Sequence, residues 1–340
     1  MAQTTFEASA PARVDLAGGT LDLWPLHVLH PGSVTVNVAI DLPARCRVRK
    51  RDGAFRVSAP DLGYERTAAK PADLLADPRG ALAGALLEAL DISEPRDIEL
   101  SSDVPYSSGL GGSSALTVAM AAALAASVGR DFGLGSESSP TADVDFVRDV
   151  ETRVLGKPAG VQDYYPPLGG GLHVIRFEPG RTRAFRRDVD PAAWLRHLTL
   201  FDTGAAHSSG MNNWEIFRAR LEGDREVASR LDDVAAAARE MAEAAEAQDF
   251  PAMGAALKQE WEARRRLAPV VSSPGVETAI DAALGAGAWG GKACGAGGGG
   301  CILILAPPER TPAVREALSR LPDGRLLLVA VQNRGLAVSG

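Results

Sequence analysis

The feature that most constrains this 340-residue chain is a run of small residues at 101–116, SSDVPYSSGLGGSSAL. Residues 97–101 before the glycines alternate polar and apolar side chains, which predicts a half-buried strand. Residues 114–128 are rich in Ala, Leu, Val and Met, which favours a helix. A glycine-rich turn between a strand and a helix directs several backbone N–H groups into one concave space, where the helix dipole also favours an anion. We expect that anion to be phosphate; the alternative is an ordinary turn in which Ser113 or Ser114 caps the helix.

The turn is not a P-loop, because no lysine follows Gly112. It resembles instead the second motif of the GHMP small-molecule kinases, named for galactokinase, homoserine kinase, mevalonate kinase and phosphomevalonate kinase. Their pattern is Pro, three residues, then Gly-Leu-Gly-Ser-Ser, and here Gly112 replaces the first serine. The resemblance implies that ATP binds over this turn, through Pro105, Ser108, Gly109, Leu110, Gly111, Gly112, Ser113 and Ser114.

Composition limits the classes of protein that need to be considered. The 46% of hydrophobic and 23% of charged residues are normal for a globule with a sizeable core, and the length favours two domains. A net charge of −7 argues against a general nucleic-acid or membrane-surface binder. Three scattered cysteines make neither a disulfide framework nor a zinc site, and no signal peptide is recognised, so we expect a cytoplasmic protein.

A second glycine-containing segment, residues 11–26, resembles the first motif of the family as sugar kinases carry it. Gly18 and Gly19 allow a sharp turn and a close approach to a ligand. Asp22 follows on a loop, where a carboxylate can accept paired sugar hydroxyls or simply cap a turn. The resemblance implies that Gly19 and Asp22 bind the substrate and that Arg13 lies beside the reacting hydroxyl. An arginine cannot act as a base, but it can stabilise developing charge.

Two carboxylates downstream complete this resemblance. Glu151 lies on a helical pattern over residues 144–155, and Asp163 follows in a Gly-x-x-Asp stretch before the glycines at 169–171. By resemblance, Asp163 accepts the proton of the substrate hydroxyl and also contacts the substrate, while Glu151 and a motif-two serine, Ser113 or Ser114, hold Mg²⁺. Oxygen ligands of this kind suit Mg²⁺, which binds through one or two carboxylates and substrate phosphates.

Residues 289–305 resemble the third family motif, and the resemblance implies that Gly297 and Gly298 contact the substrate. The glycines at 295–300 also satisfy a dinucleotide fingerprint, but that fingerprint must open a helix, whereas an apolar strand pattern follows here. We expect these glycines to let the backbone pass tightly beside the glycine-rich turn at residues 105–114. This turn is named the phosphate turn after the anion that it is expected to bind. Lys292 is predicted to be a solvated side chain rather than a ligand.

The rest of the chain is predicted from its periodicity. Residues 33–40 alternate as a strand, and 44–50 with 55–58 predict a hairpin turning at Asp52-Gly53, whose arginines form a solvated face rather than a nucleic-acid site. Helices are expected at 82–90, 215–221, 224–247, 251–267 and 314–318, and closing strands at 198–201 and 325–332. The arginines at 264–266 are expected to interact favourably with the dipole of their helix and need not be functional. His207, Asn212 and Asn213 either bind sugar hydroxyls or satisfy their own backbone.

The motifs run from Pro11 to Leu305, so the resemblance covers most of the chain. It implies an α+β, two-domain fold: an N-terminal ATP-binding domain, residues 1–180, resembling ribosomal protein S5 domain 2, and a ferredoxin-like C-terminal domain with extra helices, residues 181–340. It also implies an ATP- and Mg²⁺-dependent kinase whose partner is a small sugar or sugar phosphate. The net charge argues against nucleic acid and membrane as partners, and the oligomeric state, monomer or homodimer, stays open.

The resemblance leaves the acceptor open. The heptose 7-phosphate kinase branch, acting at the anomeric hydroxyl, is the first expectation. A phosphorylated sugar needs a second anion pocket, for which Lys157 and the arginines at 181–187 are candidates. The alternatives are a neutral hexose or pentose 1-kinase of galactokinase or fucokinase type and, from another class, a non-catalytic regulator that binds sugar or ATP. Mevalonate or homoserine is a less favoured acceptor, because Arg13 and Asp22 fit the sugar branch better.

Overall fold

The computed structural model describes residues 4–132, 140–205 and 209–340 and contains two sheets flanked by helices. The helices are α1 Leu26–Leu29, α2 Pro71–Leu75, α3 Ala81–Ala89, α4 Gly112–Ala126, α5 Pro140–Leu155, α6 Tyr165–Gly169, α7 Pro191–His197, α8 Ser209–Leu221, α9 Arg225–Ala247, α10 Phe250–Arg264, α11 Pro274–Gly285 and α12 Thr311–Ser319. The strands are β1 Thr5–Ala17, β2 Val34–Lys50, β3 Phe55–Ala59, β4 Tyr64–Ala68, β5 Arg96–Ser102, β6 Leu172–Glu178, β7 Arg181–Arg187, β8 Leu198–Asp202, β9 Gly290–Ala293, β10 Cys301–Leu305, β11 Arg325–Leu327 and β12 Ala337–Ser339. This is the expected α+β, two-domain architecture.

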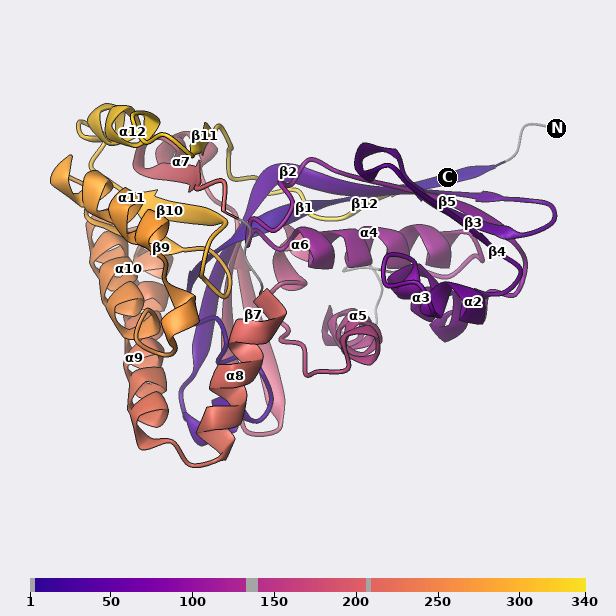
Figure 1. Cartoon of the computed structure of the whole chain (residues 1–340), viewed down its shortest axis with the longest axis horizontal. Helices are drawn as coiled ribbons and strands as arrows, with labels where there is room; N and C mark the ends of the chain where they lie inside the picture. The colour runs from indigo at the N-terminus through magenta and orange to yellow at the C-terminus, as the bar shows by residue number, and fades with distance from the viewer. Residues whose placement is uncertain (1–3, 133–139, 206–208) are drawn as a thin grey trace.

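The larger sheet has the order β12-β1-β2-β5-β3-β4, with β6 beside the first half of β2 and β7 beyond β6. β2 is long enough to serve two neighbours: Val34–Val38 pair with β6, whereas Ala44–Lys50 pair with β5. The smaller sheet, β11-β8-β10-β9, is antiparallel throughout. In Figure 1 the larger sheet runs from the right-hand end into the middle of the molecule, where β7 lies near α8, and the smaller sheet lies at the upper left with α11 and α12.

Helix α4 lies against the larger sheet, beside α3 and α5 (Figure 1). It is apolar nearly all round, and residues Val118 to Ala125 of this helix are buried in one core with the sheet. A helix of that composition is stable only inside a protein. Because its first turn follows the glycine-rich run, this burial fixes the position of the turn.

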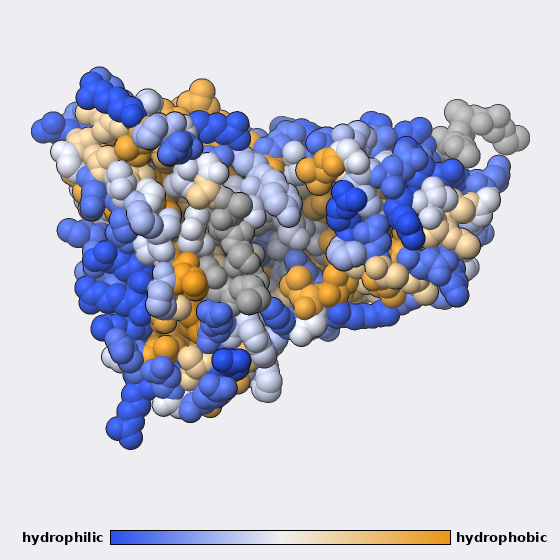
Figure 2. All heavy atoms as spheres, in the orientation of Figure 1, coloured by the Kyte–Doolittle hydropathy of each residue, from blue (hydrophilic) through white to orange (hydrophobic). Residues whose placement is uncertain are grey.

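Helices α9 and α10 pack against each other. Both helices also contact β1 of the larger sheet, and α9 contacts β2. Each begins at an aspartate, Asp224 or Asp249, whose carboxylate accepts from backbone N–H groups of the first turn. Figure 2 shows hydrophilic side chains over the outer edge of the molecule where α9 lies. Among the described residues, no helix combines the length and the hydropathy that a membrane span requires.

Several predictions about elements were wrong in detail. The hairpin predicted over residues 44–58 does not form: β2 pairs with β5, and β3 pairs in parallel with β5 and antiparallel with β4. The opening strand that the pattern of residues 6–10 predicts is longer, because β1 runs through the first motif to Ala17, and β11 ends at Leu327 instead of Gln332. The division at residue 180 stays a prediction, and β7 and β12 from beyond it belong to the larger sheet.

Candidate functional site

The glycine-rich turn between β5 and α4 has the left-handed backbone that its glycines allow. Gly109 and Gly111 have φ of 77° and 72°, and Gly111 precedes the first helical residue without a side-chain cap. The alternative of a helix capped by Ser113 or Ser114 is therefore wrong. A β-carbon on Gly112 would lie 3.0 Å from Val104. A serine at this position would therefore require a small shift of the Val104 side chain.

Arg13 connects this turn to Asp163. Its side chain is 3% exposed; Nη1 donates to the Gly109 carbonyl at 2.6 Å, and Nη2 and Nε lie 2.7 and 2.9 Å from Asp163 Oδ1. Burial opposes the charge of Arg13, but the carboxylates of Asp163 and Asp15 outweigh it and raise the pKa of the guanidinium. Arg13 is therefore a fixed cation, and the Asp163 side chain is 30% exposed beside it.

Asp22 is buried against the segment that precedes Asp163. The Gln162 N–H donates to Asp22 Oδ2 at 3.1 Å, and a β-carbon on Gly160 would overlap the carboxylate. Burial raises the pKa of Asp22 to about 7, and the charge of Asp163 adds to the shift. Two carboxyl groups predicted from separate motifs thus influence each other.

Glu151 on α5 faces the first turn of α4. Its carboxylate accepts from Ser113 Oγ at 3.3 Å and from the Tyr164 hydroxyl. Burial raises the pKa of Glu151, against hydrogen bonds from Tyr164 and from Ser113 and Ser114 that favour the carboxylate. Oxygen donors of this kind, one carboxylate and one or two hydroxyls beside the glycine-rich turn, fit the requirements of Mg²⁺. Within the described residues, no cluster of three or more His, Cys, Asp or Glu side chains could hold a metal by itself.

The glycine-rich loop between β9 and β10 packs on the phosphate turn, as expected. The Cys301 N–H donates to the Ser108 carbonyl at 2.8 Å, and a β-carbon on Gly300 would lie 2.8 Å from the same oxygen. On the other side of this loop, the Gly298 N–H donates to the Val271 carbonyl at 2.7 Å, and a β-carbon on Gly297 would overlap that oxygen. The Gly298 amide is thus bonded within the protein.

A cluster of four buried charges lies below the first-motif loop, and it corrects two expectations. Lys292 is fully buried, with Nζ 3.1 Å from Asp15 Oδ2 and 3.2 Å from Glu260 Oε1, so it is not solvated. Arg264 is also buried: it pairs with Glu260 at 2.6 Å and donates to the Gly19 carbonyl at 2.7 Å, so its role is not confined to the helix dipole.

The structure thus brings Arg13, Asp22, Glu151, Asp163 and the phosphate turn into one connected region. Sequence reasoning missed Asp15, Gln162, Tyr164 and Glu260. Two of these carried a signal, because Asp15 lies two residues from Arg13 along β1 and Glu260 lies four residues before Arg264 on α10. Asn213 accepts from Thr20 Oγ1 at 2.9 Å, while His207 and the Asn212 side chain fall outside the described residues.

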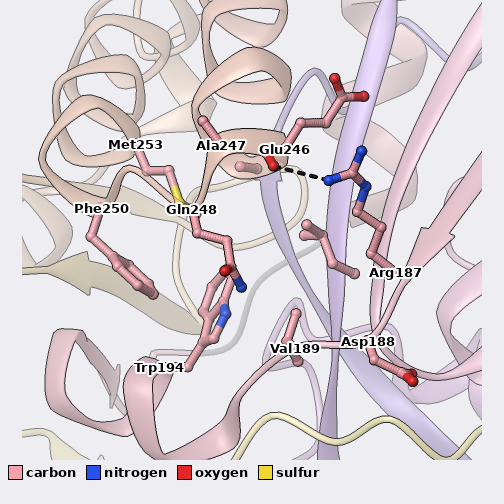
Figure 3. Close-up of a pocket in the computed structure, with 11 residues that line it drawn as sticks. Arg187, Asp188, Val189, Trp194, Glu246, Ala247, Gln248, Phe250 and Met253 are labelled. Atoms are coloured by element: carbon pink, nitrogen blue, oxygen red, sulfur yellow. Dashed lines mark hydrogen bonds between the residues drawn. The ribbon is translucent and has the colours of Figure 1, made fainter.

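A separate cavity of about 200 Å³ lies where β7 ends against the corner between α9 and α10 (Figure 3). Arg187 and Glu246 line it together with Trp194, Phe250 and Met253. The Arg187 guanidinium donates to the Glu246 carbonyl at 3.0 Å. Arg187 belongs to the arginines predicted for a second anion pocket, and none of the other predicted site residues lines this cavity.

Comparison with known proteins agrees with this arrangement. Residues 79–171 match the family model "GHMP kinases N terminal domain", and residues 241–323 match "GHMP kinases C terminal". A D-glycero-alpha-D-manno-heptose 7-phosphate kinase of Campylobacter jejuni is 26% identical, over 93% of this chain and 94% of its own. A mevalonate kinase of Thermococcus sibiricus is 25% identical over 97% of both chains. The solved structure of a D-glycero-D-manno-heptose 1-phosphate kinase from Bacteroides thetaiotaomicron is 21% identical, with a TM-score of 0.77 over 98% of this chain and 99% of its own.

Proposed function

The chain belongs to the GHMP kinase family and is therefore a phosphotransferase with an alcohol group as acceptor, and we propose that it transfers the γ-phosphoryl group of ATP to a hydroxyl of a sugar. The observation that carries this proposal is the Arg13 side chain, which bonds both to the phosphate turn at Gly109 and to Asp163. One residue thereby joins the nucleotide side of the site to the acceptor side.

In this mechanism Asp163 accepts the proton of the attacking hydroxyl, and its partly exposed carboxylate is available to a substrate. Arg13 stays cationic and stabilises the negative charge of the transferred phosphoryl group. Asp22 orients the acceptor by accepting its other hydroxyls. Phosphoryl transfer needs mainly positioning and charge neutralisation, which buried, mutually bonded side chains supply.

Glu151 with Ser113 or Ser114 would hold Mg²⁺. Bound there, the ion would neutralise charge on the phosphates. The donor set supports this, because Ser113 Oγ and the Glu151 carboxylate already lie 3.3 Å apart at the start of α4.

For the acceptor, similarity to a heptose 7-phosphate kinase supports the anomeric hydroxyl of a heptose 7-phosphate or a related sugar. One observation favours a neutral hexose or pentose instead. The cations at 181–187 that could bind a second phosphate are engaged: Arg181 and Arg183 contact Glu178, Arg186 binds Asp188, and Arg187 binds the Glu246 carbonyl. A neutral-sugar 1-kinase is therefore the second candidate.

An ADP-release assay over sugar phosphates, neutral sugars and mevalonate tests the acceptor. We expect one sugar or sugar phosphate to be turned over with a kcat/KM at least 100-fold above that of mevalonate. A heptose 7-phosphate used better than the unphosphorylated heptose supports the first candidate, and the reverse order supports the second. Preferred turnover of mevalonate, or no ADP release with any acceptor, would contradict the proposal.

The Asp163→Asn variant tests the mechanism. We expect kcat to fall by about 10² to 10⁴ while ATP binding is retained, because the amide cannot accept the proton. Asp97→Asn is the matched control, since Asp97 also binds an arginine, Arg56, at 2.9 Å but lies at the far end of β5. Unchanged turnover in Asp163→Asn would remove Asp163 from this role.

A further inference from the structure

Beneath the loop that carries Asp22 lie four charged side chains from three separate elements. Asp15 is on β1, Glu260 and Arg264 are on α10, and Lys292 is on β9; each is at most 1% exposed. Two cations and two anions cancel in charge. A buried ion network contributes little net stability, because the cost of desolvating the charges offsets their attraction. In some proteins such groups instead select one conformation of the chain around them. The position of this cluster therefore suggests a geometric role.

Arg264 is the member that reaches the loop. Its Nη2 donates to the Gly19 carbonyl at 2.7 Å, and its Nη1 donates to Thr20 Oγ1 at 3.2 Å. Thr20 Oγ1 in turn donates to Asn213 Oδ1 on α8 at 2.9 Å. One planar guanidinium thus holds two consecutive loop residues, in a geometry that a lysine cannot reproduce.

The loop needs this support because its backbone is strained. Thr20 is β-branched and has φ of 78°, a left-handed conformation that such residues rarely adopt. The turn is closed by hydrogen bonds from Leu21 N to Gly18 O and from Leu23 N to Thr20 O, both at 3.2 Å. Asp22 lies between these two bonds. A change at Thr20 would therefore move the Asp22 carboxylate.

The other charges fix Arg264 and the floor of the loop. Glu260 Oε1 accepts from Arg264 Nε at 2.7 Å and from Lys292 Nζ at 3.2 Å. Lys292 in turn holds Asp15, whose Oδ2 would lie 2.8 Å from a β-carbon on Gly19. The loop is thus held at Gly19 and Thr20 by Arg264 and supported beneath Gly19 by Asp15.

We propose that Arg264, oriented by Glu260 and Lys292, is a positioning residue for the acceptor: it holds Gly19 and Thr20 in the strained conformation that places Asp22 in the acceptor site. This rests on the proposed role of Asp22 in acceptor binding. The residue acts through the loop and does not touch the reacting atoms.

The Arg264→Lys variant distinguishes a role in positioning the loop from a contribution to the stability of the fold alone. The variant keeps a cation beside Glu260 but loses the fork that reaches Gly19 and Thr20. We expect the KM for the acceptor to rise at least tenfold, with the KM for ATP within twofold and kcat within threefold of wild type. Arg265→Lys is the matched control, because Arg265 is the next residue, lies partly exposed and pairs with Glu262 and Glu277. A lower melting temperature with an unchanged acceptor KM would overturn the proposal.

Amide hydrogen exchange of the free protein gives a readout that needs no substrate. In Arg264→Lys we expect amides of residues 18–23 to exchange at least tenfold faster, with residues 109–115 unchanged, and we expect no difference in Arg265→Lys. If no acceptor is phosphorylated at all, the proposed function fails while this result still decides the role of Arg264 in the loop. Unchanged exchange at 18–23 overturns it.

Thr20→Val replaces Arg264→Lys should that variant fail to fold. Valine keeps the branched shape of threonine and removes only the hydroxyl that joins Arg264 to Asn213. The same rise in acceptor KM and the same faster exchange are expected, and their absence counts equally against the proposal.

Discussion

Asp22 is a buried carboxyl group whose pKa is raised to about 7, first by burial and then by the charge of Asp163. If its carboxylate accepts sugar hydroxyls, binding requires the ionised form. That form makes up about a tenth of the protein at pH 6 and about nine tenths at pH 8. We therefore expect the acceptor KM to fall about tenfold between pH 6 and pH 8 at saturating ATP. Steady-state kinetics of Asp22→Asn should show a high acceptor KM without this slope, and a flat wild-type profile would contradict the assignment.

The same carboxyl group costs stability. Its pKa is higher in the folded than in the unfolded chain, so the folded state loses stability as the pH rises from about 4 to about 7. Asp22→Asn cannot ionise, and we expect it to raise the free energy of unfolding at pH 8 by on the order of 1 to 4 kcal/mol. Urea unfolding at pH 5 and pH 8 measures this, and the gain should be smaller at pH 5. A destabilised variant at pH 8 would show that the ionised form is well solvated or paired.

At the scale of elements, the contact between the two glycine-rich loops is a tight backbone crossing. Gly300 has φ of 74°, and an added β-carbon would lie 2.8 and 2.9 Å from the carbonyls of Ser108 and Ser107. Gly180, with φ of 78° and nothing within 4 Å, is the matched control. We expect Gly180→Ala to cost about 1 kcal/mol from backbone strain alone, and Gly300→Ala at least about 1 kcal/mol more from overpacking.

The two variants should also differ in their affinity for ATP. Because Gly300→Ala displaces the phosphate turn, its KM for ATP should rise about tenfold, while Gly180→Ala keeps the wild-type value. Thermal unfolding and ATP titration of both variants measure the two effects. Equal behaviour of the two variants would mean that the crossing adds nothing beyond backbone strain.

Local pattern predicted most of these elements and failed where pairing is distant. The alternation of residues 97–101 and the Ala-rich run after Gly112 gave β5 and α4, because side-chain periodicity follows from backbone geometry. The hairpin at Asp52-Gly53 was wrong, since a turn signal predicts pairing of neighbours, whereas β3 pairs with β5, about forty residues later. The pairing of distant strands depends on which faces the whole sheet buries. The periodicity of one segment does not contain that information.

Across the whole molecule, the proximity of residues could be predicted where family motifs carry them and could not be predicted where charges meet inside the fold. Arg13, Asp22 and Asp163 stand in recognisable motifs, and the structure joins them. Lys292 was predicted to be solvated, because a lysine between glycines gives no sign of burial. Its two partners, Asp15 and Glu260, lie 277 and 32 residues away, so the pairing exists only once both sheets have formed.

That pairing gives a prediction for the molecule as a whole. Lys292→Met leaves Asp15 and Glu260 buried without their common cation, and we expect a loss of about 3 to 5 kcal/mol in the free energy of unfolding at pH 8. At present Arg264 and Lys292 outweigh the effect of burial and keep the pKa of Glu260 below its usual value. Without Lys292 the Glu260 carboxylate binds a proton more readily in the folded state, so the loss should shrink as the pH falls from 8 to 5.

Glu260→Gln in the Lys292→Met background separates charge from packing. Removing one of the two carboxylates that then share a single buried cation, Arg264, should recover part of the stability at pH 8 and little at pH 5, whereas the packing change from lysine to methionine is the same in both variants. Urea unfolding of the single and double variants at the two pH values measures this coupling. A loss that is the same at both pH values, and that Glu260→Gln does not reduce, would assign the effect to packing between the two sheets. The buried charges would then contribute nothing to the free energy of unfolding beyond the packing of their side chains.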